Sequence, residues 1–178
     1  MHKLAVFPLA ALLAGALPAG AASSCEAVIA AALKSLQVPT HIYMTETAGS
    51  NGGKISNGET IYLNGTMYTS LNGVWRKSPM TVQELADARK ASGKDLGTCS
   101  MVHDEPVGVE PATLYIVHKR TPDDTVDTQI WVSKLRGLPL KQINDIDVGG
   151  GARGKSHAEI RFEYTGVSAP AVTEATHK

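Results

Sequence analysis

The stretch WVSKLRGLPLKQ, residues 131–142, gives the first clear indication of the fold. A strand-like apolar run stops at Lys134 and resumes at Leu138. Between them, Leu135-Arg136-Gly137 fits a short hairpin loop whose glycine takes the left-handed conformation. Pro139 then falls near the start of the next strand, where a missing backbone N–H does least harm. The stretch therefore predicts a β-hairpin.

Strand patterns continue on both sides of this hairpin. Asn-Gly, the strongest short-range hairpin signal, occurs at 51–52, 57–58, 64–65 and 72–73. The last two pairs predict an antiparallel meander of strands 59–63, 66–71 and 74–78. Further strands are expected at about 41–47, 99–104, 112–119, 126–134, 138–147 and 156–165.

The last predicted strand indicates how the sheet faces its surroundings. Its residues alternate strictly, with an apolar set of Ala158, Ile160, Phe162 and Tyr164 and a polar set of His157, Glu159, Arg161 and Glu163. Alternation with a period of two places one face against a core and the other in water. Two capping boxes and apolar periodicity add helices at 24–37 and 81–92. The expected class is α+β, mostly β: one large curved antiparallel sheet, its apolar side partly covered by two helices.

The first residues are typical of a secretory signal peptide. A basic start, an apolar run and small residues at a cleavage site follow one another over 1–22. We expect export to the bacterial periplasm, a single domain over 23–168, a flexible tail over 169–178, and no transmembrane segment after cleavage.

The chain has two cysteines, Cys25 and Cys99. An even pair in an oxidising compartment predicts one disulfide. Two alternatives stay open: Cys25 as the acylated first residue of a lipid-anchored protein, and two free buried thiols.

No pattern in the sequence points to catalysis. The chain carries 17 basic and 17 acidic residues without a basic stripe, which disfavours nucleic acid binding. Residues 149–156 match the phosphate-loop pattern, but a strand rather than a helix is expected to follow them. The histidines lack metal-ligand spacing. We expect a protein that is not an enzyme and that uses no metal or cofactor.

The apolar residues are more informative. Two modest helices have to cover eight or nine strands, so an incompletely covered apolar concavity is expected, and such surfaces bind something. A buried methylene contributes about 0.8 kcal/mol, so an enclosed chain of about fifteen carbons offers roughly 12 kcal/mol before association costs. A lipid binder therefore needs no polar motif. The rival reading is a periplasmic protein-interaction or envelope-sensor module with a fully packed sheet and no ligand.

Several short segments resemble the LolA-like outer-membrane lipoprotein carrier superfamily. They are Gly65-Thr66-Met67-Tyr68, Gly73-Val74-Trp75-Arg76-Lys77, Trp131-Val132-Ser133-Lys134, Gly137-Leu138-Pro139-Leu140-Lys141 and Tyr164-Thr165-Gly166-Val167. The resemblance implies a half-barrel, a strongly curved antiparallel sheet whose concave face is covered by helices. It also implies a non-enzymatic envelope protein that carries or senses a lipid or an acylated protein, with an envelope protein as a possible partner.

Carried over by position, the resemblance assigns two sets of residues. Trp131, Gly137, Leu138 and Pro139 would build the structural hairpin. The cavity would be lined by Ile42, Met44, Met67, Leu114, Ile116, Ile130, Val132, Leu140, Ile160, Phe162 and Tyr164.

Overall fold

The computed structural model describes residues 24–49, 53–149 and 154–172. These residues form the helices α1 (Ser24–Ser35) and α2 (Val82–Ser92) and a short 3-10 turn, η1 (Gly93–Asp95). They also form the strands β1 (Thr40–Ala48), β2 (Ile55–Leu63), β3 (Thr66–Leu71), β4 (Val74–Lys77), β5 (Thr98–Val107), β6 (Glu110–Arg120), β7 (Thr125–Ser133), β8 (Pro139–Asp147) and β9 (Lys155–Glu163).

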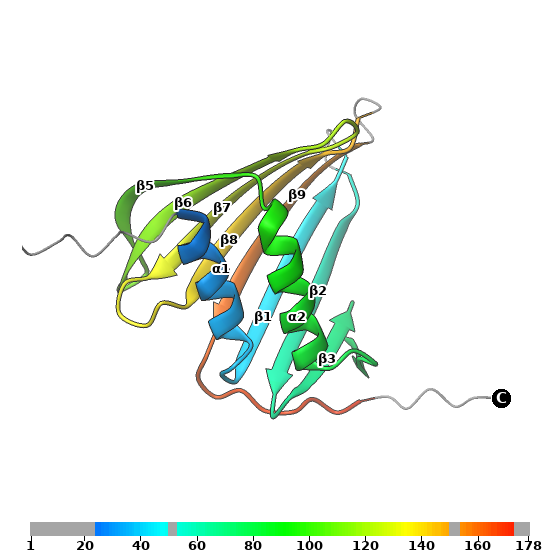
Figure 1. The fold of residues 1–178 in the computed structure, drawn as a ribbon. Coiled ribbons are helices and arrows are strands. Elements are labelled where there is room, and N and C mark those ends of the chain that lie inside the picture. The colour runs from blue at the N-terminus through cyan, green and yellow to red at the C-terminus, as the bar shows by residue number, and fades with distance from the viewer. Residues whose placement is uncertain (1–23, 50–52, 150–153, 173–178) are drawn as a thin grey trace, which may run out of the picture.

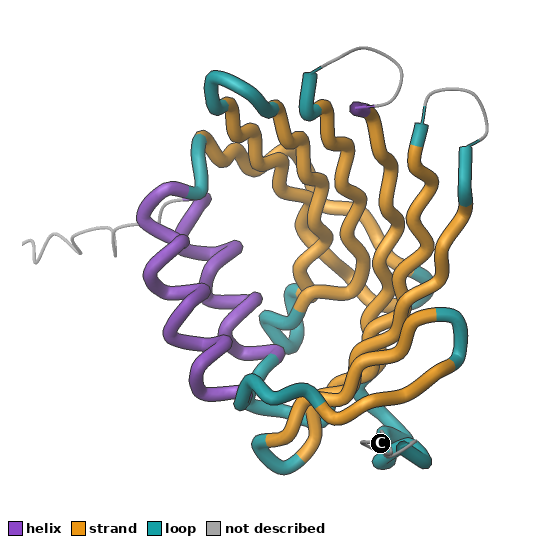
Figure 2. Tube along the Cα trace, turned by 90° about the vertical axis from the view of Figure 1, so that its right-hand side faces the viewer, coloured by secondary structure: helices purple, strands orange, loops and turns teal. Residues whose placement is uncertain are grey.

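All strands of the described residues belong to one sheet with the order β4-β3-β2-β1-β9-β8-β7-β6-β5. Every neighbouring pair is antiparallel. The sheet is strongly curved and stays open, and both helices lie over its concave face (Figures 1 and 2). The predicted half-barrel, mostly β with two covering helices, is therefore confirmed.

Tight turns join the strands of the meander where the Asn-Gly pairs predict them. Asn64 and Asn72 have positive φ angles of 50° and 52°, which the two-residue turns between antiparallel strands require. Asn57-Gly58 instead lies inside β2, so this strand begins earlier than expected. Gly58 faces Met44 of β1, and a Cβ at this position would lie 3.0 Å from the Met44 Cε. The glycine therefore allows the Met44 side chain to pack closely against the backbone of β2. The pair at 51–52 lies outside the described residues.

The phosphate-loop match at 149–156 runs into a strand. Residues 150–153 lie outside the described part, and β9 begins at Lys155. A phosphate loop would lead into a helix, whose N-terminus holds the phosphates.

The stretch 131–142 forms the hairpin between β7 and β8. Gly137 has a φ of 61°, the left-handed conformation expected for it. Its N–H donates to the Ser133 carbonyl at 2.8 Å, and Pro139 begins β8 and is fully buried. Trp131 and Leu138 are also buried.

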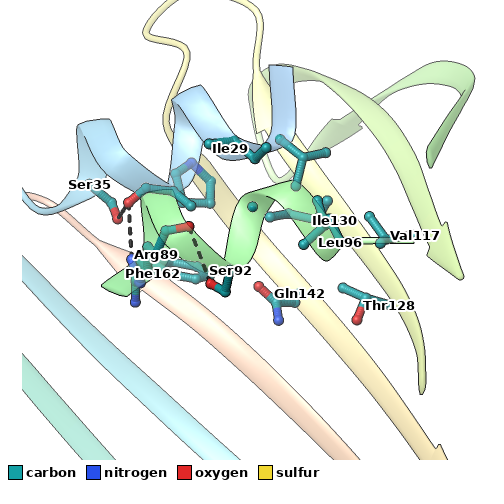
Figure 3. A pocket seen from close by; sticks show the side chains of 14 residues that line it. Ile29, Ser35, Arg89, Ser92, Leu96, Val117, Thr128, Ile130, Gln142 and Phe162 are labelled. Carbon is teal, nitrogen blue, oxygen red and sulfur yellow. Dashed lines mark hydrogen bonds between the residues drawn. The ribbon is translucent and has the colours of Figure 1, made fainter. Parts of the chain in front are cut away.

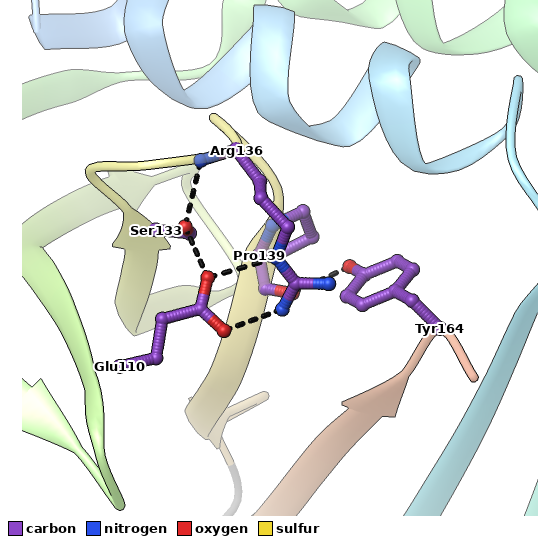
Figure 4. Close-up of polar contacts among 5 residues, drawn as sticks. All are labelled: Glu110, Ser133, Arg136, Pro139 and Tyr164. Carbon is purple, nitrogen blue, oxygen red and sulfur yellow. Dashed lines mark hydrogen bonds and ion pairs between the residues drawn. The ribbon is translucent and has the colours of Figure 1, made fainter.

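Polar contacts fix this hairpin to the start of β6 and to the end of β9 (Figure 4). The Arg136 guanidinium donates through Nε and Nη2 to the two carboxylate oxygens of Glu110, and Ser133 donates to the same carboxylate. The Tyr164 hydroxyl donates to the Pro139 carbonyl, and Arg136 lies 5.0 Å from the centre of the Tyr164 ring. The bidentate ion pair between Arg136 and Glu110 fixes the orientation of the two side chains as well as the distance between them.

A disulfide joins Cys25 in the first turn of α1 to Cys99 in β5, 74 residues along the chain. The predicted disulfide is confirmed, and it attaches α1 to one edge of the sheet. At the other end of α1, Lys34 Nζ donates to the Arg136 carbonyl of the β7–β8 hairpin. Both ends of α1 are therefore held.

Two apolar clusters occupy the two faces of the sheet. On the concave face, Val28 and Ala31 of α1 pack against Val117, Ile130 and Val132. The convex face carries a second buried cluster of Ala112, Leu114, Trp131 and Leu140. The end of the β5–β6 hairpin contributes to its cover, because Val107 packs against it and Glu105 accepts a hydrogen bond from the Trp131 ring nitrogen.

The expected signal peptide, residues 1–22, lies outside the described residues, as does most of the expected tail. In the ranges that the structure covers, none of the helices is long and apolar enough to cross a membrane. The division of the chain into a signal peptide, a domain over 23–168 and a flexible tail over 169–178 stays a prediction.

Candidate functional site

A pocket of about 280 Å³ lies between the two helices and the concave face of the sheet. Figure 3 shows it from close by. Residues of both helices, of η1 and of four strands line it together: Val28, Ile29, Ala32, Ser35, Arg89, Ser92, Gly93, Leu96, Val117, Thr128, Ile130, Pro139, Gln142 and Phe162. Most of this lining is apolar. The volume lies just below the ~300–1,000 Å³ typical of small-molecule sites.

The pocket exists because α2 does not fill the concavity beneath it. All residues of α2, Val82 to Ser92, are at least partly exposed. By contrast, α1 buries Val28, Ala31 and Ser35. The capping box between Thr81 and Glu84 stabilises the start of α2 locally, worth about 1 kcal/mol. The position of α2 thus depends little on burial, and the space under it stays open.

Arg89 links the two helices at the side of the pocket. Its Nη1 donates to the Ala32 carbonyl of α1 at 3.0 Å, and its Nη2 donates to the Tyr62 hydroxyl at 3.4 Å. Burial raises the pKa of the Tyr62 hydroxyl, against the opposing effect of the nearby guanidinium. Among the described residues that line the pocket, Arg89 alone carries a charge, and its hydrogen bonds hold it to the protein.

Polar side chains form one part of the pocket floor. Thr128 of β7 and Gln142 of β8 line the pocket, and both donate to the side-chain oxygen of Asn144, at 3.0 and 2.8 Å. Asn144 is the register partner of Thr128 on the adjacent strand. These three uncharged groups form a connected network on the concave face.

The structure places seven of the expected cavity residues on the concave face. They are Ile42, Met44, Met67, Ile130, Val132, Ile160 and Phe162, which share this face by register. Ile130 and Phe162 line the pocket itself. Ligand contact by this set stays a prediction.

The four other expected cavity residues lie elsewhere. On β6, Tyr115 is the partner of Ile130, so Tyr115 and Val117 face the helices while Leu114 and Ile116 point to the convex side. At Leu140 the register between β7 and β8 shifts by one residue, and the side chain packs with Trp131 on the convex side. Tyr164 follows the end of β9 and joins the same convex cluster. These four positions are corrections to the expected lining.

Several lining residues were not expected from the sequence. The helix residues Ile29 and Ala32 carry a detectable signal, because they lie on the apolar side of a periodic helix. Val117 was missed because both faces of β6 are apolar, which leaves its alternation ambiguous. Gln142 and Thr128 carry no such signal.

In the part of the chain that the structure describes, no group of three or more His, Cys, Asp or Glu side chains is arranged to hold a metal ion. The described histidines pair with one carboxylate, except that His157 also has Glu159 at 3.7 Å from its Nε2. His157 Nδ1 lies 2.7 Å from Asp145, and His41 Nε2 lies 2.7 Å from Glu59.

Comparison with known proteins gives distant structural matches. The lipoprotein LppX from Mycobacterium tuberculosis is 8% identical, with a TM-score of 0.47, over 82% of this chain and 97% of that chain. The MucA/MucB complex of Pseudomonas aeruginosa gives 15% identity and a TM-score of 0.43, over 83% of this chain and 58% of that chain. A LolA superfamily protein from Nitrosomonas europaea is 8% identical, with a TM-score of 0.33, over 80% of this chain and 92% of that chain.

No family model matches the sequence, and no curated protein matches it. The structural similarities are too low to carry functional conclusions. The architecture implied by the LolA-like resemblance rests on the strand order and on the placement of the two helices over the concave face.

Proposed function

We propose that this chain is a periplasmic, non-enzymatic binding or carrier protein that holds the acyl chain of a lipid or of an acylated protein. The observation that carries the proposal is the largely apolar pocket between the helices and the sheet. It favours a ligand over the rival reading of a fully packed sheet. Export through residues 1–22 is part of the proposal.

The size of the pocket limits the affinity. One water takes about 30 Å³ of the liquid, and a methylene group is of similar size, so 280 Å³ holds roughly nine methylene groups. At about 0.8 kcal/mol each, they contribute roughly 7 kcal/mol before association costs. We therefore expect a Kd of micromolar order or weaker. The larger value from fifteen carbons assumed complete enclosure, which this pocket does not provide.

The proposal is tested with the neutral lipophilic dye N-phenyl-1-naphthylamine and the purified mature protein. The dye should brighten and saturate, and a lauroyl compound should displace it. Two variants of α1 form a matched pair. Ala32→Phe fills the pocket, and Ala30→Phe adds the same group at an exposed position of the same helix.

We expect Ala32→Phe to weaken dye binding by at least about tenfold, because an aromatic side chain occupies most of a space this small. Ala30→Phe should bind as the wild type does. Circular dichroism establishes that both variants are folded. A wild-type protein that does not brighten the dye, or two variants that bind it equally well, would overturn the assignment of the pocket.

A further inference from the structure

We propose that the ligand of this pocket has an uncharged head group that both donates and accepts hydrogen bonds, such as a glycerol ester or a hydroxy-amide. The inference rests on the proposed function and adds the chemistry of the head group to it. It comes from the network of Thr128, Gln142 and Asn144 on the concave face, of which Thr128 and Gln142 line the pocket together with the apolar residues.

Within the described residues, this network leaves one acceptor atom and one donor atom without any hydrogen-bond partner. The Asn144 side-chain oxygen receives hydrogen bonds from both Thr128 and Gln142. Among the hydrogen bonds of the described residues, none uses the Gln142 amide oxygen or the Asn144 amide nitrogen. Figure 3 shows Gln142 and Thr128 side by side on the floor of the pocket. All three residues are half-buried, and Gln142 lines the pocket, so a ligand that enters without meeting the Gln142 amide oxygen leaves that oxygen partly desolvated.

The charges around the network disfavour an anionic head group. Arg89 donates to two uncharged groups, the Ala32 carbonyl and the hydroxyl of Tyr62 on β2, and β2 lies three strands away from Asn144 on β8. Glu46 lies on the concave face in the same cross-strand row as Asn144, since both are register partners of Ala158. Two strand spacings separate them, about 10 Å. A carboxylate or phosphate at the network would therefore approach a negative side chain. Lys119, on the same face of β6, is paired with Asp95 at 2.9 Å.

On the sheet side of the lining, the polar side chains lie away from the β7–β8 hairpin. Phe162 and Pro139 lie toward the β7–β8 hairpin, whereas Thr128 and Asn144 lie further along their strands. An acyl chain would occupy the end nearer the hairpin, and its head group would reach the network.

The test compares ligands that share the lauroyl chain and differ only in the head group. Monolauroylglycerol, methyl laurate and laurate compete against N-phenyl-1-naphthylamine at a pH where laurate is ionised. We expect monolauroylglycerol to displace the dye at about fivefold to tenfold lower concentration than either of the others, the effect of one or two hydrogen bonds. Methyl laurate lacks a donor and thereby separates hydrogen bonding from the mere absence of charge.

Two variants on neighbouring strands locate the effect. Gln142→Leu removes the free acceptor from the pocket, and Gln129→Leu makes the same change on the convex face of β7. We expect the preference for monolauroylglycerol to fall to within about twofold of unity in Gln142→Leu and to persist in Gln129→Leu. Thr128→Val, which keeps the shape and removes the hydroxyl, is the second pocket variant, should Gln142→Leu not fold.

The outcomes separate the head-group proposal from the proposed function. Equal displacement by all three ligands, or stronger displacement by laurate, would overturn the head-group proposal and leave acyl binding intact. A preference that survives in both pocket variants would overturn it too, because the network would not be its source. Displacement by none of the ligands would instead contradict the proposed function.

Discussion

Removal of the disulfide between Cys25 and Cys99 tests how the helix that closes the pocket is held. The bond joins residues 74 positions apart, so it closes a loop that contains the meander and α2. The chain-entropy estimate for a loop of this length is about 4.5 kcal/mol at 25 °C. Domains of this size are stable by only about 5–15 kcal/mol. The double variant Cys25→Ala/Cys99→Ala should therefore lose about 30% or more of the wild-type free energy of unfolding.

The measurement is urea-induced unfolding of the oxidised wild type, the reduced wild type and the double variant, followed by tryptophan fluorescence. The free energies of unfolding of the reduced wild type and the double variant should agree within about 1 kcal/mol, because the alanine substitutions remove little packing. Hydrogen exchange adds a local readout. The start of α1 should lose protection before its end, since Lys34 still holds the end to the Arg136 carbonyl.

A difference below about 1 kcal/mol between the oxidised wild type and the double variant would refute the reasoning. Intact mass before and after reduction is the accompanying control. A gain of two hydrogens on reduction identifies the bond, whereas an acyl mass on Cys25 would establish the lipid-anchored alternative.

Three further predictions concern stability. Gly97→Ala should destabilise the fold by several kcal/mol more than Gly73→Ala in the same urea assay. Both glycines have a positive φ angle. A Cβ at Gly97 would lie 2.3 Å from the His118 carbonyl oxygen, whereas a Cβ at Gly73 would face open space. Hydrogen bonds from the Arg136 guanidinium lower the pKa of Glu110. The contribution of Glu110 to folding stability is therefore present above about pH 4.3 and lost as the pH falls through the folded pKa. The difference in free energy of unfolding between wild type and Glu110→Gln should close on acidification. A hydrogen bond to the Asp145 carboxylate on β8 raises the pKa of His157. The contribution of His157 to folding stability is present below about pH 6.5 and lost as the pH rises through the folded pKa. The difference in free energy of unfolding between wild type and His157→Gln should therefore shrink in alkaline buffer, and an unchanged difference would contradict the pairing.

Local geometry explains why the strands and turns could be predicted closely. The turns at Asn64 and Asn72 need positive φ, and few residue types other than glycine and asparagine accept it. Gly137 and Pro139 likewise restrict their own backbone, so the hairpin at 131–142 could be recognised without knowledge of its neighbours. Asn57 shows the limit of this reasoning, since its pair with Gly58 continues a strand against β1.

The composition of the pocket could be predicted only in part. Ile130 and Phe162 belong to strands with one apolar face, and their alternation placed them correctly on the concave side. Leu114 lies on a strand with two apolar faces, so its direction depends on which face meets α1. Leu140 lies at a register shift, which reverses the side on which a residue points.

The sequence by itself determined the order of the strands and helices, the tight turns and the most regular apolar faces, because each depends on the φ preferences and periodicity of residues close together in the chain. Tertiary structure decided that β9 pairs with β1 and that α2 lies over the concavity without filling it. It also decided between the predicted disulfide and its alternatives, since it brings Cys25 to Cys99. It also decided that Gln142 lines the same pocket as apolar residues of α1. These features depend on contacts between distant segments, whose register and curvature no local pattern encodes.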